Sequence, residues 1–332
     1  MPFSTKTYIF SDNSFDVISL IAAVWVMLAH TLNYSGVLGN VPDFVGRSLL
    51  NPGQAVTIMF FVSGYLCFPS LDRSSVLLSF YKKRFWRVIP AFVFVNVGFA
   101  LLWVVVGQVG LSDITNYLLR TAKSLVSLDA GWTPEGALNN GSLWTIPVQI
   151  QFYLLTPCLA FFLRKSELHK SILIVIIGLV LYFLFEPISA KNLFLSKLCF
   201  PYLYTYIFGM FCFEYRDRII PIVVHWLPAM LLCYMVMCWL FGFQVPLITN
   251  HLLMLSTLGT AYAFGKKRIR NEISYEIYLW HMPVFSVVSY MNKSIGCSHL
   301  LFVYLLTALI SYMCFKYLET PLRTLENRKR YV

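Results

Sequence analysis

Charged side chains are scarce in this sequence. Only 12% of its 332 residues are Asp, Glu, Lys or Arg, whereas 58% are hydrophobic and the mean hydropathy is +0.68. An ordinary soluble domain carries about 25% charged residues. The scarcity of charge therefore excludes a typical soluble domain and indicates a polytopic membrane protein.

The short motifs of several enzyme classes are also absent. The eight cysteines lie mostly within apolar stretches, never occur as Cys-x-x-Cys and never share zinc-ligand spacing with histidine, so we expect a packing role for them and predict no metal site. The sequence contains no phosphate-binding or dinucleotide-binding glycine loop, no Gly-x-Ser-x-Gly motif and no internal repeat. The first fourteen residues carry no small-residue cleavage site, so we expect the first apolar stretch to be retained.

The sequence contains many long apolar stretches. Crossing a bilayer takes about 20 residues as a helix, and no stretch shows the alternation of a membrane strand. We therefore predict an all-α polytopic bundle of about ten transmembrane helices, forming a single domain over residues 1–332. The predicted spans are 15–36, 53–71, 86–107, 143–163, 171–187, 199–213, 220–241, 245–264, 274–292 and 299–318.

The lysines and arginines predict the orientation of this bundle. With both termini in the cytoplasm, 20 of the 26 Lys and Arg residues fall in the inner segments, which include a basic tail at 319–332. The net charge of +11 is then mostly topological, and we expect no nucleic-acid partner. The one long connection, 108–142, lies outside in this topology and has the length of a lid or substrate surface.

His30 stands in the first span, within the segment AAVWVMLAHTLNYSG. A helix that starts at residue 15 carries it about 22 Å along, into the outer half of the bilayer. An ionisable side chain at that depth is costly and by default marks a functional site that faces the bundle interior. The alternative is a neutral imidazole that only hydrogen-bonds to a neighbouring helix.

A basic cluster, YKKRFWRVIPAF, precedes most of the third span. Arg84 and Arg87 are three residues apart, so they share one helical face and are able to grip a pyrophosphate together. The alternative is that these positive charges serve only to orient the helix in the membrane. In the second span, Ser63 and Gly64 interrupt an apolar run and would allow close helix approach.

Two later segments also bring polar groups into the bundle. The segment GSLWTIPVQIQFYLLTP places Trp144 at the outer interface and buries Gln149, together with a second glutamine. The segment ISYEIYLWHMPVF places Tyr278 and His281 on one helical face near the inner surface, where a structural role is the alternative to ligand binding. Asp16 would pair with a nearby arginine or interact only with the helix dipole.

Six stretches in this order resemble acyltransferase family 3, the multi-spanning O-acyltransferases that modify cell-envelope glycans. They cover the chain from about residue 15 to 323, and we expect no appended extracytoplasmic esterase-like domain. The six are His30 late in the first span, FFVSGYL in the second, RFWRVIP, SLWTIPVQIQFYLLTP, SYEIYLWHMP and the closing YLETP.

The resemblance implies an acyl-CoA donor, usually acetyl-CoA, and as acceptor a sugar hydroxyl of a glycan or lipid-linked precursor. On this basis His30 is the general base or a transient acyl carrier, and Gln149 positions His30 or the acceptor. The expected donor-binding residues are Arg84, Arg87, Lys83, Tyr278 and His281. The expected substrate-binding residues are Trp144, Ser63 and Asp16. Membrane lipids complete the set of expected partners, and a bacterial inner membrane is the expected location.

The chain departs from the family pattern at two positions. Family members commonly carry an arginine eleven residues before the histidine, where this sequence has Ser19, and a glutamate where it has Gln149. Both changes remove a charge, so Arg84 and Arg87 would have to hold the donor phosphates. A glutamine orients an imidazole by a hydrogen bond but stabilises imidazolium less than a carboxylate does. Reduced or absent activity is therefore one alternative.

Two other function classes use a polar cavity in a membrane bundle. A transporter or flippase would move a glycolipid or small solute without acyl transfer, but such folds often consist of two similar halves, and the sequence has no such symmetry. A polymerase or ligase of envelope sugars would need basic residues in its large outer loop to bind lipid-linked diphosphates. Segment 108–142 has only two, Arg120 and Lys123, which counts against this class.

Overall fold

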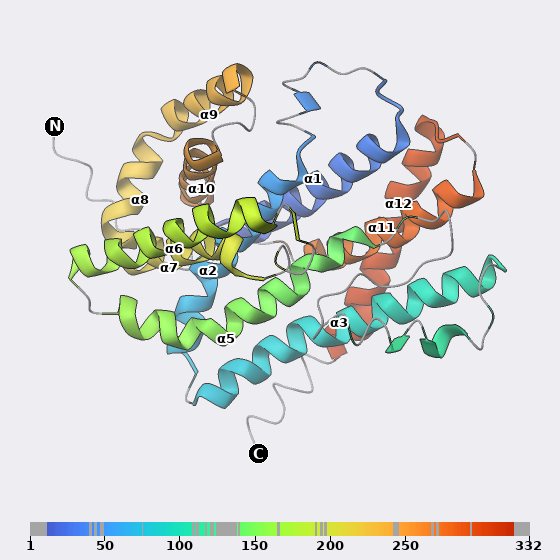
Figure 1. Cartoon of the computed structure of the whole chain (residues 1–332), viewed down its shortest axis with the longest axis horizontal. Helices are drawn as coiled ribbons and strands as arrows, with labels where there is room; N and C mark the ends of the chain where they lie inside the picture. The colour runs from blue at the N-terminus through green and yellow to red at the C-terminus, as the bar shows by residue number, and fades with distance from the viewer. Residues whose placement is uncertain are drawn as a thin grey trace.

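The computed structural model of the chain is a bundle of helices (Figure 1). Most of the predicted outer segment 108–142 and of the basic tail 319–332 lies outside the described residues. The structure describes residues 12–321 except for 40, 41, 43–44, 47–49, 75, 108–109, 111–112, 117, 120–122, 124–137, 139, 165–166, 190, 193–194, 196–197, 242–245, 267–268, 270–271 and 293.

The regular structure of the described residues is helical throughout, which confirms the all-α prediction. Three short elements are the 3-10 turns η2 (Gly141–Trp144) and η4 (Phe200–Tyr202) and the π-helical turn η5 (Phe315–Glu319). The α-helices are α1 (Phe15–Ser35), α2 (Pro52–Asp72), α3 (Leu77–Val105), α5 (Thr145–Leu163), α6 (Leu168–Ser189), α7 (Leu203–Glu214), α8 (Arg216–His225), α9 (Leu227–Phe241), α10 (Pro246–Ala263), α11 (Ser274–Met291) and α12 (Cys297–Cys314).

Every predicted span contains a helix, but fewer than ten are clear membrane spans. Among the described residues, six helices are long and apolar enough to cross a bilayer: α1, α2, α3, η2 with α5, α6, and α12 with η5. The bent pair α8 and α9 makes a seventh. Helix α7 has only 12 residues, and α10 and α11 have 18 each. The count of ten and the sides of the two termini therefore stay predictions.

Two helices differ from the predicted boundaries for identifiable reasons. The predicted span 220–241 is broken into α8 and α9, which are inclined at 71°. Pro228, the second residue of α9, lacks an amide hydrogen, and its ring would clash with a carbonyl of a continuous helix. Helix α3 begins at Leu77, before the predicted start at residue 86, so the basic cluster is part of the helix. This extension is favourable because Lys and Arg are good helix formers.

Local sequence signals explain two helix ends near the site. Helix α1 ends before Gly36, whose φ of 66° is a left-handed conformation that glycine adopts without strain. Helix α2 begins with Pro52 after Asn51, whose side-chain oxygen accepts a hydrogen bond of 2.9 Å from the amide of Gly53. These two ends frame the connection between the first two helices.

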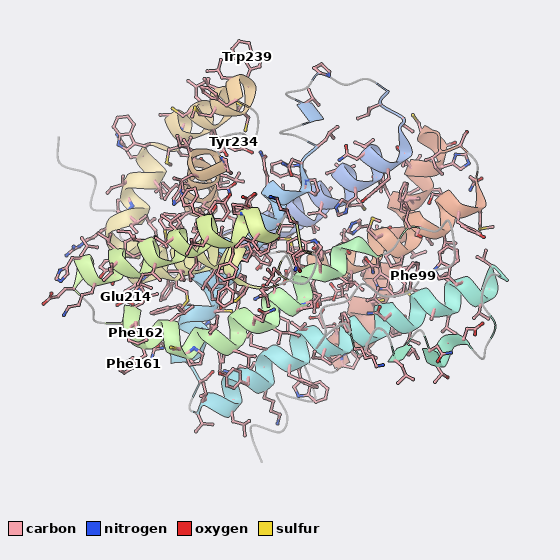
Figure 2. All side chains as sticks on the ribbon, viewed as in Figure 1. Phe99, Phe161, Phe162, Glu214, Tyr234 and Trp239 are labelled. Carbon is pink, nitrogen blue, oxygen red and sulfur yellow. The ribbon has the colours of Figure 1, made fainter. Side chains whose placement is uncertain are left out.

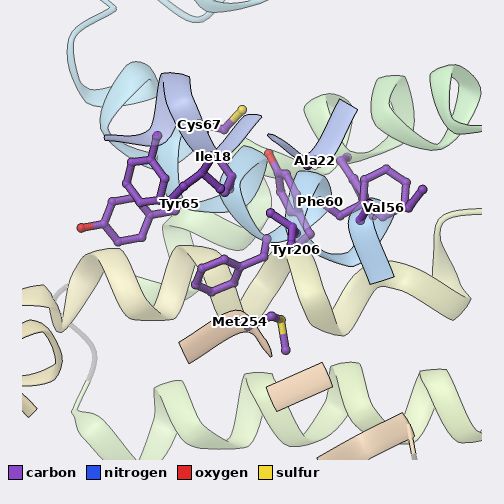
Figure 3. Packing of buried hydrophobic residues seen from close by; sticks show 14 of the residues in the cluster. Ile18, Ala22, Val56, Phe60, Tyr65, Cys67, Tyr206 and Met254 are labelled. Atoms are coloured by element: carbon purple, nitrogen blue, oxygen red, sulfur yellow. The ribbon is translucent and has the colours of Figure 1, made fainter. Parts of the chain in front are cut away.

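Helix α2 forms the centre of the packed core with α1, α7 and α10. A Cβ atom at Gly64 would overlap the carbonyl oxygen of Tyr206, and one at Gly209 would overlap that of Phe61. The predicted role of Gly64 in close helix approach is thus confirmed. Figure 3 shows buried side chains from these helices in contact, among them Ile18, Ala22, Val56, Phe60, Tyr65, Cys67, Tyr206 and Met254.

The outer surface of the bundle carries large apolar side chains. Phe161, Phe162 and Trp239 are 77%, 54% and 64% exposed, and Figure 2 shows them at the outer edge of the molecule, on α5 and α9. Polar residues such as Gln54 and Asn96 are buried instead. Extended apolar exposure of this kind is typical of a surface that faces lipid.

Candidate active site

A cavity of about 120 Å³ lies between α1, α2, α3, α5 and α11. A cavity of roughly 150 Å³ is known to admit a benzene ring, so this volume suits a small acyl group and not a whole nucleotide. Its polar lining comes from five helices and the segment before α11: Ser19, Ser63, Arg84, Arg87, Thr145, Gln149, Tyr153, Glu272, Ser274, Tyr275 and Tyr278.

Arg84 is held on one wall of this cavity by two aromatic rings. Its guanidinium carbon lies 5.3 Å from the ring centroid of Phe80 and 5.3 Å from that of Tyr153. Both distances are within the range of a cation–π interaction. Its buried Nε atom has no hydrogen-bond partner among the described residues. The aromatic rings therefore fix the guanidinium without using all of its donors.

Arg87 lines the same wall one turn further along α3. Its Nη2 atom lies 4.0 Å from Oε1 of Glu272, a carboxylate that also accepts a hydrogen bond of 2.6 Å from Ser274. Charge-assisted hydrogen bonds are normally about 2.7–2.9 Å long, so Glu272 faces Arg87 without closing on it. The prediction that Arg84 and Arg87 share one face is confirmed, and both face the cavity.

Gln149 and Ser63 form a polar patch on the cavity wall between α5 and α2. The amide nitrogen of Gln149 donates a hydrogen bond of 2.9 Å to Oγ of Ser63. Ser19 lies on the same lining. Both departures from the family pattern, Ser19 and Gln149, therefore face one cavity. The amide of Gln149 is bonded to Ser63 and has no hydrogen bond to His30 among the described residues.

Tyr278 is the residue of α11 furthest along the chain that lines the cavity. Its hydroxyl donates a hydrogen bond of 2.9 Å to the carbonyl of Ser142 and shares another of 2.9 Å with Thr145. The side chain is 1% exposed. These two bonds hold the side chain of Tyr278 in place on the cavity wall.

Beyond Tyr278, His30 of α1 and His281 of α11 form a pair. His30 Nδ1 lies 3.0 Å from His281 Nε2, and the two rings stack at a centroid distance of 5.3 Å. The centroid of the Tyr278 ring is 6.0 Å from that of His281. Two ring contacts thus join the cavity wall to His30, although neither histidine lines the cavity itself.

The remaining predicted residues lie away from this cavity. Trp144 packs against the rings of Phe60 and Tyr202, at centroid distances of 6.3 and 5.0 Å. Lys83 donates a hydrogen bond of 3.0 Å to Oγ of Ser74. Asp16 lies in the first turn of α1. The structure therefore brings together Ser63, Arg84, Arg87, Gln149 and Tyr278, but not these three.

Sequence reasoning missed two residues of the site. Glu272 lies just before the predicted span, and the sequence signal for it is a carboxylate beside the apolar run of α11. Tyr153 lies one turn beyond Gln149 on α5, and its contact with Arg84 depends on how α3 and α5 pack. In the part of the chain that the structure describes, no group of three or more His, Cys, Asp or Glu side chains is placed to hold a metal ion.

Comparison with known proteins identifies relatives of this chain. The family described as "Acyltransferase domain", acyltransferase family 3, matches residues 12–316. Nodulation protein 10 of Rhizobium leguminosarum bv. viciae is 27% identical over 306 residues, which cover 82% of each chain. The O-acetyl transferase of Shigella phage Sf6 is 28% identical over 179 residues, 51% of this chain and 52% of that protein. No solved structure matches the chain.

Proposed function

This chain belongs to acyltransferase family 3, and we propose that it is an O-acetyltransferase that uses acetyl-CoA to acetylate a sugar hydroxyl. The acceptor is a cell-surface polysaccharide or its lipid-linked precursor. The observation that carries the proposal is a small cavity with two arginines on one wall and a histidine pair behind another. A relative named O-acetyl transferase supports acetyl as the transferred group.

The donor binds with its phosphates at the arginine wall. Arg84 and Arg87 present guanidinium groups to one cavity, and guanidinium matches phosphate oxygens through paired donors. The volume of about 120 Å³ leaves room for the acetyl end of the donor, while the nucleotide stays at the mouth. Arg87 and Glu272 are 4.0 Å apart, so a phosphate is able to replace the carboxylate as the partner of Arg87.

His30 acts as the general base. Its Nε2 atom accepts the proton of the acceptor hydroxyl while the hydroxyl oxygen attacks the thioester carbonyl carbon. The carbon–sulfur bond then breaks, and CoA leaves as a thiol with the proton from His30. The alternative is that His30 itself carries the acetyl group for one step. In either route the side chains that separate the cavity from His30 move aside, among them Tyr278, which lines the cavity and contacts the ring of His281.

The bacterial cytoplasmic membrane is the proposed location, with both termini in the cytoplasm. The excess of lysine and arginine in the inner segments, 20 of 26, supports this orientation. It places the basic cluster of α3 on the side where acetyl-CoA is made. His30 and His281, expected in the outer half and near the inner surface, are in contact and so lie at one depth between the two sides. Donor and acceptor would then approach the site from opposite sides.

Expression in cells whose surface glycan lacks O-acetyl groups tests the proposal. We expect the parent chain to add one acetyl mass to the glycan and the His30→Ala variant to lose about 10²–10⁴-fold in rate, the usual share of a general base. His169→Ala is the matched control, because the side chain of His169 is 72% exposed and pairs with Glu167 on the surface. Acetylation at the parental rate by His30→Ala would remove His30 from the mechanism.

A transporter or flippase is the second candidate, and the break between α8 and α9 favours it. Discontinuous helices are common in transporters, where they usually recur in both halves of the chain. One bent pair occurs among the described residues, at 71°. The same expression experiment separates the two functions: a transporter leaves the mass of the glycan unchanged, with or without His30.

A further inference from the structure

We propose that His281 is a positioning residue that holds His30 in its Nδ1–H tautomer and so leaves Nε2 of His30 unprotonated. This inference rests on the proposed function, in which Nε2 of His30 accepts the proton of the acceptor. It gives His281, which the sequence predicted as a donor-binding residue, a different role. The juxtaposition joins residues 251 positions apart in the sequence.

The protonation of His281 follows from its partners. Its Nδ1 atom lies 3.2 Å from the carbonyl oxygen of Ile277. A carbonyl oxygen only accepts hydrogen bonds, so Nδ1 carries the hydrogen. His281 is fully buried, at 0% exposure, and burial disfavours a charged imidazole. In a neutral ring with hydrogen on Nδ1, the Nε2 atom has only a lone pair and acts as an acceptor.

The protonation of His30 follows in turn. Its Nδ1 atom lies 3.0 Å from Nε2 of His281, and a hydrogen bond at that distance needs one donor. Since Nε2 of His281 accepts, Nδ1 of His30 donates. The hydrogen bond of one ring nitrogen thereby sets the state of the other, and Nε2 of His30 is left as a base. Among the described residues, no group hydrogen-bonds to that Nε2 atom.

The opposite assignment leaves one contact unsatisfied. With hydrogen on Nε2 of His281, its Nδ1 lone pair would point at the carbonyl of Ile277, which is repulsive. Among the described residues, the other rings within contact distance of the pair belong to Tyr34 and Tyr278, and neither is a charged group. The backbone carbonyl of α11 is therefore the fixed point from which both tautomers are determined.

Two substitutions of His281 separate positioning from packing. His281→Gln keeps an acceptor, its side-chain oxygen, near the former Nε2 atom. His281→Leu keeps a side chain of similar size but has no acceptor. We expect His281→Leu to lower kcat about 10- to 100-fold with little change in the KM for acetyl-CoA. His281→Gln should recover most of that loss. Equal losses in both variants, or a loss confined to KM, would overturn the proposal.

Nitrogen NMR of the full chain, labelled with ¹⁵N-histidine in lipid nanodiscs, tests the tautomer without any assay of activity. The sequence has six histidines, and the His30→Ala variant identifies the signals of His30 by subtraction. We expect Nδ1–H for His30 in the parent and in His281→Gln, and a mixture or Nε2–H in His281→Leu. Nε2–H in the parent would refute the inference directly.

These readouts also distinguish failure of this inference from failure of the proposed function. If His30→Ala keeps full acetylation while the parent shows Nδ1–H, the base assignment fails, but the histidine pair holds His30 as inferred. If His30→Ala loses activity and the parent shows Nε2–H, the base assignment stands and the role of His281 is wrong. The tautomer is read from the parent spectrum once the His30→Ala spectrum has assigned the His30 signals, and unchanged signals from the histidines outside the pair show that this variant is folded.

Discussion

The arginine wall and the histidine pair differ in how their polar atoms are hydrogen-bonded. Arg84 and Arg87 form the arginine wall, and His30 and His281 form the histidine pair. At the arginine wall, the buried Nε of Arg84 has no partner among the described residues, and the carboxylate nearest to Arg87 is 4.0 Å away. In the histidine pair, three of the four ring nitrogens are in hydrogen-bond contacts of 3.0 and 3.2 Å.

This difference indicates that the arginine wall suits ligand binding and the histidine pair suits proton transfer. Buried donors without partners cost free energy until a ligand supplies acceptors, so the arginine wall suits an anionic ligand. A pair in which every nitrogen but one is bonded is already organised, so the remaining nitrogen suits proton transfer without rearrangement of its own ring. Changes at the arginines should therefore act on donor binding, and changes at the histidines on the chemical step.

The largest effect on the arginine side is expected from the double variant Arg84→Ala plus Arg87→Ala. A hydrogen bond to a charged group contributes about 1.5–3 kcal/mol, so each arginine should account for at least about tenfold in the Kd of acetyl-CoA. Isothermal titration of purified protein with acetyl-CoA measures the change. The tautomer of His30 should be the same as in the parent, because neither arginine contacts the histidines.

Arg218→Ala is the matched control for this double variant, since Arg218 is an exposed arginine of α8 that does not line the cavity. It should bind acetyl-CoA like the parent. Parental affinity in the double variant would leave topogenic charge as the role of both arginines. A fall in affinity in the control as well would mean that total charge, and not the arginine wall, attracts the donor.

A smaller effect of opposite sign is expected from Glu272→Gln. If the donor binds as proposed, the carboxylate competes with its phosphate for Arg87, and the amide removes that competition while it can still accept the hydrogen bond from Ser274. Because partly exposed pairs are worth about 0–1 kcal/mol, we expect the Kd of acetyl-CoA to fall by up to about fivefold. Weaker binding would instead show that Glu272 orients Arg87 for the donor.

Much of the fold was predictable because the bilayer imposes it. Apolar stretches of about 20 residues have to be helices in lipid, and each predicted span does contain one. Pro228 is a sequence signal for the break of 220–241, although the apolar length of this segment predicts one continuous span. The number of true crossings was less predictable, because α7, α10 and α11 are short or polar and rely on the packed interior for burial.

The site was predictable where its residues are close in sequence. Arg84 and Arg87 share a face because they are three residues apart on one helix, which spacing alone fixes. The pairing of His30 with His281 depends on how α1 packs against α11, so no local pattern contains it. For the same reason, no local pattern shows that Gln149, predicted to position His30 or the acceptor, has Ser63 as its hydrogen-bond partner.

The smallest effect is expected from Lys83→Ala, although Lys83 is the immediate neighbour of Arg84. Its ammonium donates to Ser74, and it is not part of the cavity lining, so it reaches a bound donor only through diffuse attraction. Attraction of that kind is screened over about 8 Å at physiological salt. The Kd of acetyl-CoA should change less than about twofold at 0.15 M salt and somewhat more at low salt. A tenfold loss that persists at high salt would extend the donor site to Lys83 and remove the distinction between facing the cavity and lying beside it.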